Sequence, residues 1–259
     1  MIESCVIIGS GNLAYHISKA FQTTDINILQ LFGRNEEKTK SIAQKFNIPY
    51  CIDELDLILD ADIYIICVSD SAIDQVAAID QLKNKFLVHV AGSINISVLA
   101  KYTQTYGVMY PLQTFSSFRD LSYSEIPFFI EGSSTQEEDE LTEFVKNISE
   151  KICIMNSRDR LYLHLSAVIA NNFSNHMFAI ADQLLKKHKL SFDYLRPLIL
   201  ETAQKAMIST PLDAQTGPAV RNNPDVMAKH IELLNEHDDW QKIYTFVSNS
   251  IYNLSQNKQ

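Results

Sequence analysis

A turn near the N-terminus has the residue types and spacing to bind a phosphate. Residues Val6–Ala14 read VIIGSGNLA, an apolar run followed by two glycines and a small alanine. Gly9 permits a tight turn, Gly11 lets a pyrophosphate approach the backbone, and Ala14 lets a helix pack closely on a strand. N–H groups at the helix start would meet the phosphates. A tight turn without a ligand is the alternative. The predicted dinucleotide-binding residues are Gly9, Ser10, Gly11, Asn12, Leu13 and Ala14.

The end of the second apolar run indicates which dinucleotide would bind. It reads Leu31-Phe32-Gly33-Arg34-Asn35, about 20 residues past the glycine turn, where an NAD site usually has an acid and an NADP site often has an arginine. No acid precedes Arg34, and a guanidinium can pair bidentately with the 2′-phosphate. We therefore expect NADP, held by Arg34 and Asn35; the alternative is a solvated arginine at a helix start.

Two further strand ends should border the same crevice, because ligands bind outside the carboxyl ends of parallel strands. Small and polar residues there suit contact with ribose and nicotinamide. Helix capping explains Ser69, Asp70 and Ser71, after the first of these strands, equally well. We expect Val68, Ser69, Asp70, Ala91 and Gly92 to contact the cofactor and Ser93 to contact the substrate.

A long apolar segment beginning near Leu161 carries polar residues on one side of its predicted helix. His164 and Asn171 are seven residues apart and so lie nearly on one face of a helix, and Asn172 lies about 80° round the helix from His164, still on the same side. Buried polar groups need partners. From helix geometry alone, a satisfied hydrogen-bond cluster is the commoner explanation, and a substrate site is the alternative.

The elements that would position these residues fall into two unlike parts. In the first, short apolar runs alternate with helical segments, which implies crossover connections and a mostly parallel sheet. The predicted α/β domain spans 1–155 and an all-helical domain spans 156–259. Predicted strands are Ser4–Ile8, Asn27–Phe32, Tyr50–Ile52, Ile63–Val68, Phe86–Val90, Gly107–Met109, Phe128–Glu131 and Ile152–Met155. Predicted helices are Leu13–Phe21, Asn35–Phe46, Ser71–Leu82, Gln136–Ser149, Leu161–His188, a helix from Phe192 or Tyr194 to Ile208, Pro224–Asn235 and Asp239–Leu254.

The helical part also carries a candidate anion-binding loop and an excess of apolar residues. Gly217-Pro218 is a turn that stops a helix, and Arg221 follows on a polar stretch. Arg221 there suits a carboxylate or phosphate on a substrate, and capping of a helix is the alternative. The long and last helices carry more apolar surface than a small bundle needs, which predicts a homodimer; a well-packed core of the helical domain is the alternative.

Composition excludes several other classes of protein. With 22 Lys and Arg against 31 Asp and Glu, the net charge of −9 argues against nucleic-acid binding. No apolar run approaches the roughly 18 residues of a membrane span. The start lacks the basic region of a signal peptide. The four cysteines lack metal-ligand spacing, so we expect buried thiols, no metal and a cytoplasmic location.

Four motifs occur together and in order: Gly9–Ala14, Tyr110–Phe115, Tyr162 with His164 and Asn172, and Thr216–Arg221. Together they resemble the two-domain family that joins a Rossmann-like NADP-binding domain to a C-terminal helical domain of unknown function. That family is similar to pyrroline-5-carboxylate reductases, deazaflavin-dependent NADP reductases and the β-hydroxyacid dehydrogenase group. The resemblance implies a C-terminal domain like that of 6-phosphogluconate dehydrogenase, and a dimer.

The sequence departs from the family's patterns at three points. Tyr110 stands where the family usually has histidine, and Asn222-Asn223 stand where it usually has Gly-Asp. The lysine that β-hydroxyacid dehydrogenases place near the start of the long helix is missing. His164 is the nearest titratable substitute, with a proton available near neutral pH.

The leading hypothesis is an NADP-dependent oxidoreductase acting on a small carbonyl, imine or hydroxy-acid substrate in an interdomain cleft. His164 would give or take the proton and Asn172 would hold the reacting group. A redox-sensing NADP(H)-binding module without turnover is the alternative, and a deazaflavin as hydride partner is a third possibility. The predicted substrate-binding residues are Ser93, Gln113, Thr216 and Arg221.

Overall fold

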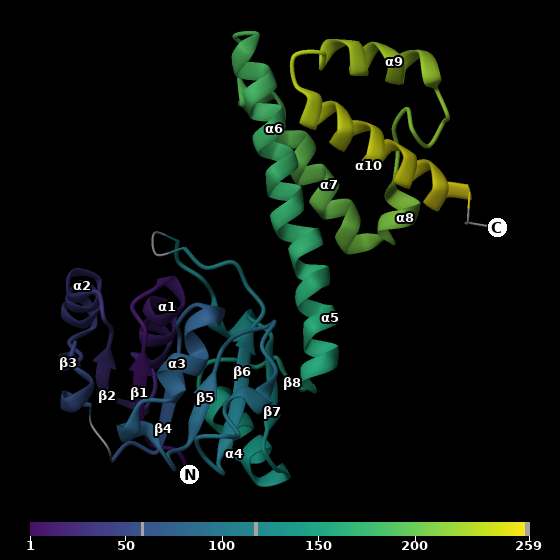
Figure 1. Cartoon of the computed structure of the whole chain (residues 1–259). Helices are drawn as coiled ribbons and strands as arrows, with labels where there is room; N and C mark the ends of the chain where they lie inside the picture. The colour runs from purple at the N-terminus through teal and green to yellow at the C-terminus, as the bar shows by residue number, and fades with distance from the viewer. Residues whose placement is uncertain (58–59, 117–118, 257–259) are drawn as a thin grey trace. The chain divides into compact units, whose positions relative to one another are not determined.

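A mostly parallel sheet forms the first part of the chain. The computed structural model describes residues 1–57, 60–116 and 119–256. Within them, eight strands pair in the order β3-β2-β1-β4-β5-β6-β7-β8, and all neighbours are parallel except β6 and β7 (Figure 1). The strands are β1 (Ser4–Ile8), β2 (Asn27–Phe32), β3 (Tyr50–Cys51), β4 (Ile63–Ile66), β5 (Leu87–His89), β6 (Tyr106–Pro111), β7 (Phe128–Gly132) and β8 (Ile152–Ile154). The predicted fold class is confirmed.

The central strands are buried on both faces, which explains their continuous apolar sequences. Successive side chains of β1 enter two different cores: Ile7 belongs to one, while Val6 and Ile8 belong to the other. β4 repeats this alternation with Ile65 on one face and Tyr64 on the other. The helices between the strands are α1 (Asn12–Phe21), α2 (Glu36–Phe46), α3 (Ile73–Ala77) and α4 (Thr135–Lys146).

One expectation about the cysteines is wrong. Cys5, Cys51 and Cys67 are buried free thiols, but Cys153 is exposed. The cause is the place of its strand: in the part of the chain that the structure describes, β8 pairs only with β7 and ends the sheet. An apolar run at a sheet edge reads like an interior strand, although one side of it lacks a neighbour.

Helices follow the sheet to the end of the described chain. They are α5 (Ser157–Ala167), a π-helical segment (Val168–Phe173), α6 (Ser174–Lys187), α7 (Arg196–Ile208), α8 (Pro211–Ala214), α9 (Pro224–Leu233) and α10 (Asp238–Gln256). Asn223 caps α9 by accepting from the Val226 N–H at 3.3 Å, and Pro224 opens the helix. No helix among the described residues is long and apolar enough to span a membrane.

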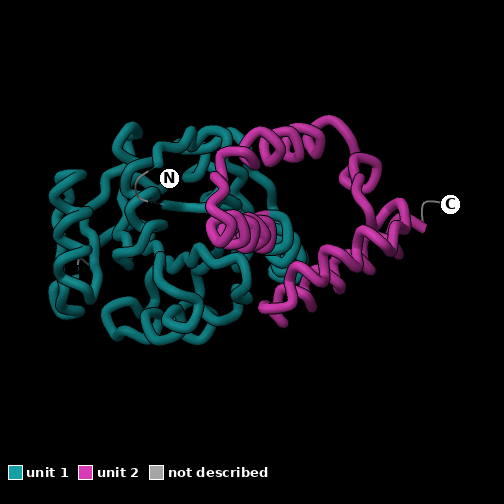
Figure 2. Tube along the Cα trace, turned by 90° about the horizontal axis from the view of Figure 1, so that it is seen from above, with its two compact units in different colours: residues 1–170 teal, residues 171–259 magenta. Residues whose placement is uncertain are grey.

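The chain divides into two compact units, Met1–Ala170 and Asn171–Gln259 (Figure 2). The sheet ends at Ile154, but α5 belongs to the first unit. A domain boundary after residue 155 therefore stays a prediction. The second unit leaves many large apolar side chains exposed, among them Phe173, Leu198, Met207, Ile208, Leu233 and Phe246.

Candidate functional site

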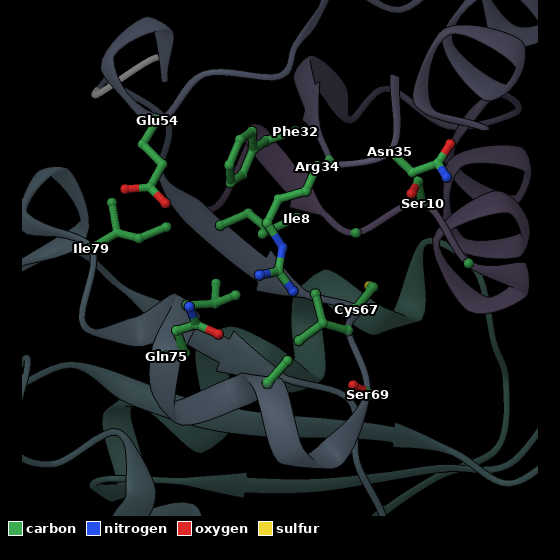
Figure 3. A pocket seen from close by; sticks show the side chains of 16 residues that line it. Ile8, Ser10, Phe32, Arg34, Asn35, Glu54, Cys67, Ser69, Gln75 and Ile79 are labelled. Atoms are coloured by element: carbon green, nitrogen blue, oxygen red, sulfur yellow. The ribbon is translucent and has the colours of Figure 1, made fainter. Parts of the chain in front are cut away.

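A cavity of about 300 Å³ lies at the carboxyl ends of β1, β2 and β4. It collects many of the residues predicted to contact a dinucleotide (Figure 3). Because these strands are parallel, their carboxyl ends meet at one edge of the sheet, which is where open α/β sheets bind ligands. The predicted residues that line the cavity are Gly9, Ser10, Gly11, Arg34, Asn35, Val68 and Ser69.

The glycine turn has the backbone geometry of a phosphate cradle. Gly9 has φ +137°, and its N–H donates to the Phe32 carbonyl at 2.7 Å. A Cβ there would lie 2.3 Å from the Cys67 carbonyl oxygen, so the turn packs directly against the backbone that follows β4 and leaves no room for a side chain. Gly11, the N-cap of α1, has no atom within 4 Å of the place a Cβ would occupy and no side-chain cap. The first-turn N–H groups of α1 therefore face an open approach, which fits a pyrophosphate.

Arg34 extends into the cavity from the end of β2 (Figure 3). Among the described residues it forms no ion pair, so its guanidinium is available to an anion. Glu54 and Gln75 line other walls, and sequence reasoning missed both because they lie outside the strand-end motifs. The Asn35 side chain instead caps α2, with its oxygen accepting from the Lys38 N–H at 2.9 Å.

The structure brings together Asp70, a predicted cofactor contact, and Ser93, a predicted substrate contact. The Ser93 hydroxyl donates to the Asp70 carboxylate, linking the segments that follow β4 and β5. The Ala91 N–H donates to His89 Nδ1 at 3.2 Å. The first contact joins the two loops, and the second stabilises the loop that follows β5.

A tyrosine–histidine pair stands beside this linkage, within the first unit. Tyr110, near the end of β6, places its Oη 3.0 Å from Nδ1 of His164 on α5. A Cβ on Gly92 would lie 2.6 Å from that Nδ1 and 2.7 Å from Tyr110 Cζ. Only glycine leaves room for both rings. Burial, and secondarily the charge of Asp70, raise the pKa of Tyr110.

Helix α5 is fastened to the sheet by a buried ion pair that sequence reasoning missed. The Arg160 side chain is fully buried, pairs with Glu131 and donates to the Ile94 carbonyl at 2.6 Å. The Ser157 N–H and hydroxyl also donate to Glu131, at 2.9 and 2.7 Å. Burial, followed by the charge of Arg160, lowers the pKa of neighbouring His89 to about 3.

The segment after β6 is tied to α1. The Asn12 amide donates to the Phe115 carbonyl at 3.1 Å, so the Asn12 side chain stabilises the segment after β6. Both ring nitrogens of His16 are engaged, one with Tyr123 Oη at 2.8 Å and one with the Ser116 carbonyl at 2.9 Å. Gln113, on this segment, is exposed.

Other predicted residues lie apart from the cavity. Ala14 is fully buried in the core and Leu13 packs against it. Asn172 lies in the π-helical segment, where the Asn171 amide reaches its side-chain oxygen at 3.5 Å. Thr216 and Arg221 are exposed residues of the second unit. In the described part of the chain, no His, Cys, Asp and Glu cluster could hold a metal ion.

Two family models match the chain. "NADP oxidoreductase coenzyme F420-dependent" matches residues 4–93, and "Domain of unknown function (DUF2520)" matches residues 126–251. A structure from Bacteroides fragilis, provisionally assigned as an NADP oxidoreductase, is 38% identical, with a TM-score of 0.92 over 97% of this chain and 98% of that one. No protein with a curated description matches significantly.

More distant solved structures share the fold. Pyrroline-5-carboxylate reductase from Streptococcus pyogenes is 17% identical, with a TM-score of 0.61 over 96% of this chain and 98% of that one. A reductive aminase from Aspergillus terreus, in complex with NADPH and ethyl-5-oxohexanoate, is 13% identical, with a TM-score of 0.70 over 99% and 93%.

Proposed function

Because this chain belongs to the family that joins an NADP oxidoreductase domain to a DUF2520 domain, we propose that it transfers a hydride between NADP(H) and a small carbonyl, imine or hydroxy acid. NADP is the cofactor of this family. One observation carries the proposal: the open glycine turn lies at the carboxyl end of β1, and Tyr110, which contacts His164 of α5, lies at the carboxyl end of β6, which runs in the same direction in the same sheet. The reductases that share the fold support hydride transfer to carbon bonded to oxygen or nitrogen.

The residues around the cavity fit NADP. The backbone of Gly9–Ala14 and the start of α1 would hold the pyrophosphate, and Arg34 would pair with the 2′-phosphate. Ser69, Asp70 and Gly92 follow the next strand ends, and we propose that they contact the ribose and the nicotinamide. When bound, NADPH supplies the hydride, while the protein binds, orients and manages protons.

The proton would be handled by His164, since no lysine occurs in α5 (Ser157–Ala167). His164 is half-buried and its Nε2 forms no hydrogen bond with any described residue. We propose that Ser93 and Gln113 of the first unit bind the reacting part of the substrate, by virtue of their polar side chains. Asn172, Thr216 and Arg221 of the second unit are also proposed as substrate contacts, and the Arg221 guanidinium suits a carboxylate.

We also propose that the protein is a homodimer. The second unit exposes large apolar side chains on several helices, including Phe173, Leu198 and Phe246. Many exposed large apolar side chains on one helical unit favour an interaction surface there, because exposed apolar area is unfavourable in water. A second copy of the same unit would cover it.

The test combines binding with turnover. Calorimetry with NADPH and NADH measures cofactor affinity, and NADPH oxidation is followed with ketones, keto acids, cyclic imines and a deazaflavin. His164→Gln should lower kcat by about 100-fold or more while NADPH affinity stays unchanged. Failure of the wild-type protein to bind NADPH, or full activity of His164→Gln, would refute the proposal.

A second candidate function is a redox sensor that binds NADP(H) without turnover. The observation that favours it is the lack of a lysine in α5, where related dehydrogenases carry their catalytic acid. Tight NADPH binding with no hydride transfer to any compound of the panel would support the sensor. The deazaflavin belongs in that panel because the N-terminal family model names coenzyme F420.

A further inference from the structure

The hydrogen bond between Tyr110 and His164 has a direction that bears on catalysis. We infer that Tyr110 is a positioning residue: its hydroxyl donates to Nδ1 of His164, so the neutral imidazole carries its proton on Nε2. The tautomer rests on geometry alone, whereas its catalytic consequence rests on the function proposed above.

The donor in this hydrogen bond is identified from the partners that are available to the Tyr110 hydroxyl and to the His164 ring. Tyr110 Oη has His164 Nδ1 as its hydrogen-bond partner among the described residues, at 3.0 Å. If Nδ1 carried the proton, the phenol hydrogen of this half-buried side chain would have no acceptor. With the phenol donating, the imidazole nitrogen, a stronger acceptor than a phenol oxygen, is satisfied. The raised pKa of Tyr110 agrees, because it keeps the hydroxyl protonated.

Both rings are held in place by their surroundings. They meet edge to face, with centroids 5.8 Å apart and an interplanar angle of 69°. Gly92 lies close against both, and Tyr110 also packs on Phe129 at 6.3 Å. One helical turn before His164, Arg160 fastens α5 to the sheet. The pair is therefore pre-organised, as a proton-transferring group must be.

The other tyrosine–histidine pair of the first unit shows what a structural pair looks like. His16 uses both ring nitrogens, one toward Tyr123 and one toward the Ser116 carbonyl, and its side chain is buried. His164 uses only Nδ1, and its Nε2 is free of described partners. The ring that keeps one nitrogen free is the one that can serve a ligand.

In the reducing direction the protons balance as follows. A bound reduced dinucleotide would supply the hydride, and the residues of the chain would handle the proton. The Nε2–H bond of His164 breaks as the product O–H or N–H bond forms, and Nδ1 takes the Tyr110 proton, so the imidazole stays neutral. Solvent then protonates Nε2 of His164 while Nδ1 returns its proton to the Tyr110 oxygen, which restores the starting tautomer.

The tautomer can be read in the protein without cofactor. Nitrogen-15 NMR of histidine-labelled protein, above neutral pH, distinguishes protonated from unprotonated ring nitrogens, and His164→Gln assigns the signal. We expect the proton on Nε2 in the wild type and averaging over both tautomers in Tyr110→Phe. Tyr123→Phe is the matched control, which should alter His16 alone. A wild-type proton on Nδ1, or an unchanged tautomer in Tyr110→Phe, would overturn the inference.

Kinetics separate this inference from the proposed function. With any substrate found in the panel, Tyr110→Phe should lower kcat by roughly 10- to 100-fold and leave KM and NADPH affinity nearly unchanged. Loss of activity in His164→Gln with normal kcat in Tyr110→Phe would refute the positioning role but keep the function. A protein that turns over nothing would refute the function, and the NMR result would still decide the tautomer.

Discussion

Replacing Gly11 by alanine should weaken NADPH binding without weakening the fold. Gly11 has φ −89° and ψ −177°, a conformation open to any L-residue, and no atom lies within 4 Å of where its Cβ would be. An alanine that fits its native conformation commonly adds about 0.4–1 kcal/mol to the free energy of unfolding, because the unfolded chain becomes less flexible. The methyl group would occupy the side from which a pyrophosphate approaches.

Gly9→Ala gives the contrast two residues away. There φ is +137° and the new Cβ would lie 2.3 Å from the Cys67 carbonyl oxygen, which belongs to the backbone. Backbone strain of about 1–3 kcal/mol adds to the cost of moving the segment after β4. We expect the free energy of unfolding of Gly9→Ala to fall by about 2 kcal/mol or more.

Urea denaturation and calorimetry measure the two effects separately. Loss of one charge-assisted hydrogen bond to phosphate, about 1.5–3 kcal/mol, should raise the Kd of Gly11→Ala for NADPH roughly 10- to 150-fold. Its unfolding midpoint should match or exceed that of the wild type. Wild-type NADPH affinity in Gly11→Ala, or destabilisation equal to that of Gly9→Ala, would refute the assignment of this turn to the pyrophosphate.

Three further predictions address selectivity, pH and assembly. Arg34→Ser should raise the Kd for NADPH about 10-fold or more but leave that for NADH unchanged, because only NADPH carries the 2′-phosphate; equal losses would contradict this. Burial lowers the pKa of His89 from 6.5 to about 3. As the pH falls below 6.5, the imidazole takes up a proton in the unfolded chain but not in the folded one, so the free energy of unfolding decreases until the pH reaches about 3. Between pH 7 and pH 5 the wild type should lose about 2 kcal/mol more than His89→Asn, and parallel urea curves would contradict it. Sedimentation at micromolar concentration should give a dimer that Phe246→Ser weakens, whereas a monomeric wild type would exclude it.

The regular parts of the sheet could be predicted because a strand that is buried on both faces is a continuous run of apolar residues, which is visible in the sequence. The runs Ser4–Ile8 and Asn27–Phe32 were predicted with the bounds that β1 and β2 have. The segment Ser71–Leu82 was predicted as one helix but contains α3 flanked by two 3₁₀ turns, Asp70–Ala72 and Asp80–Leu82. Apolar spacing does not separate these tighter turns from an α-helix over such short lengths.

Some contacts of the candidate site could be predicted from neighbouring residues in the sequence, whereas others join residues far apart in the chain. The glycine turn and Arg34 are local, since a few neighbouring residues define each motif, and they line one cavity. The pairs Tyr110–His164 and Glu131–Arg160 join residues 54 and 29 positions apart. Spacing along the chain says nothing about which strands become neighbours, so these pairs required the structure.

The two long-range pairs are linked by the geometry of strand and helix. In the sheet, Val108 is paired with His89 on one side and Glu131 on the other, and Tyr110 stands two residues further along β6. Two residues of strand advance about 6.6 Å, and the four residues from Arg160 to His164 advance about 6 Å along α5. Fastening Arg160 to Glu131 therefore leaves His164 at the height of Tyr110. We therefore expect the buried ion pair, which is costly to desolvate, to set the register of the tyrosine–histidine pair, a role beyond stability.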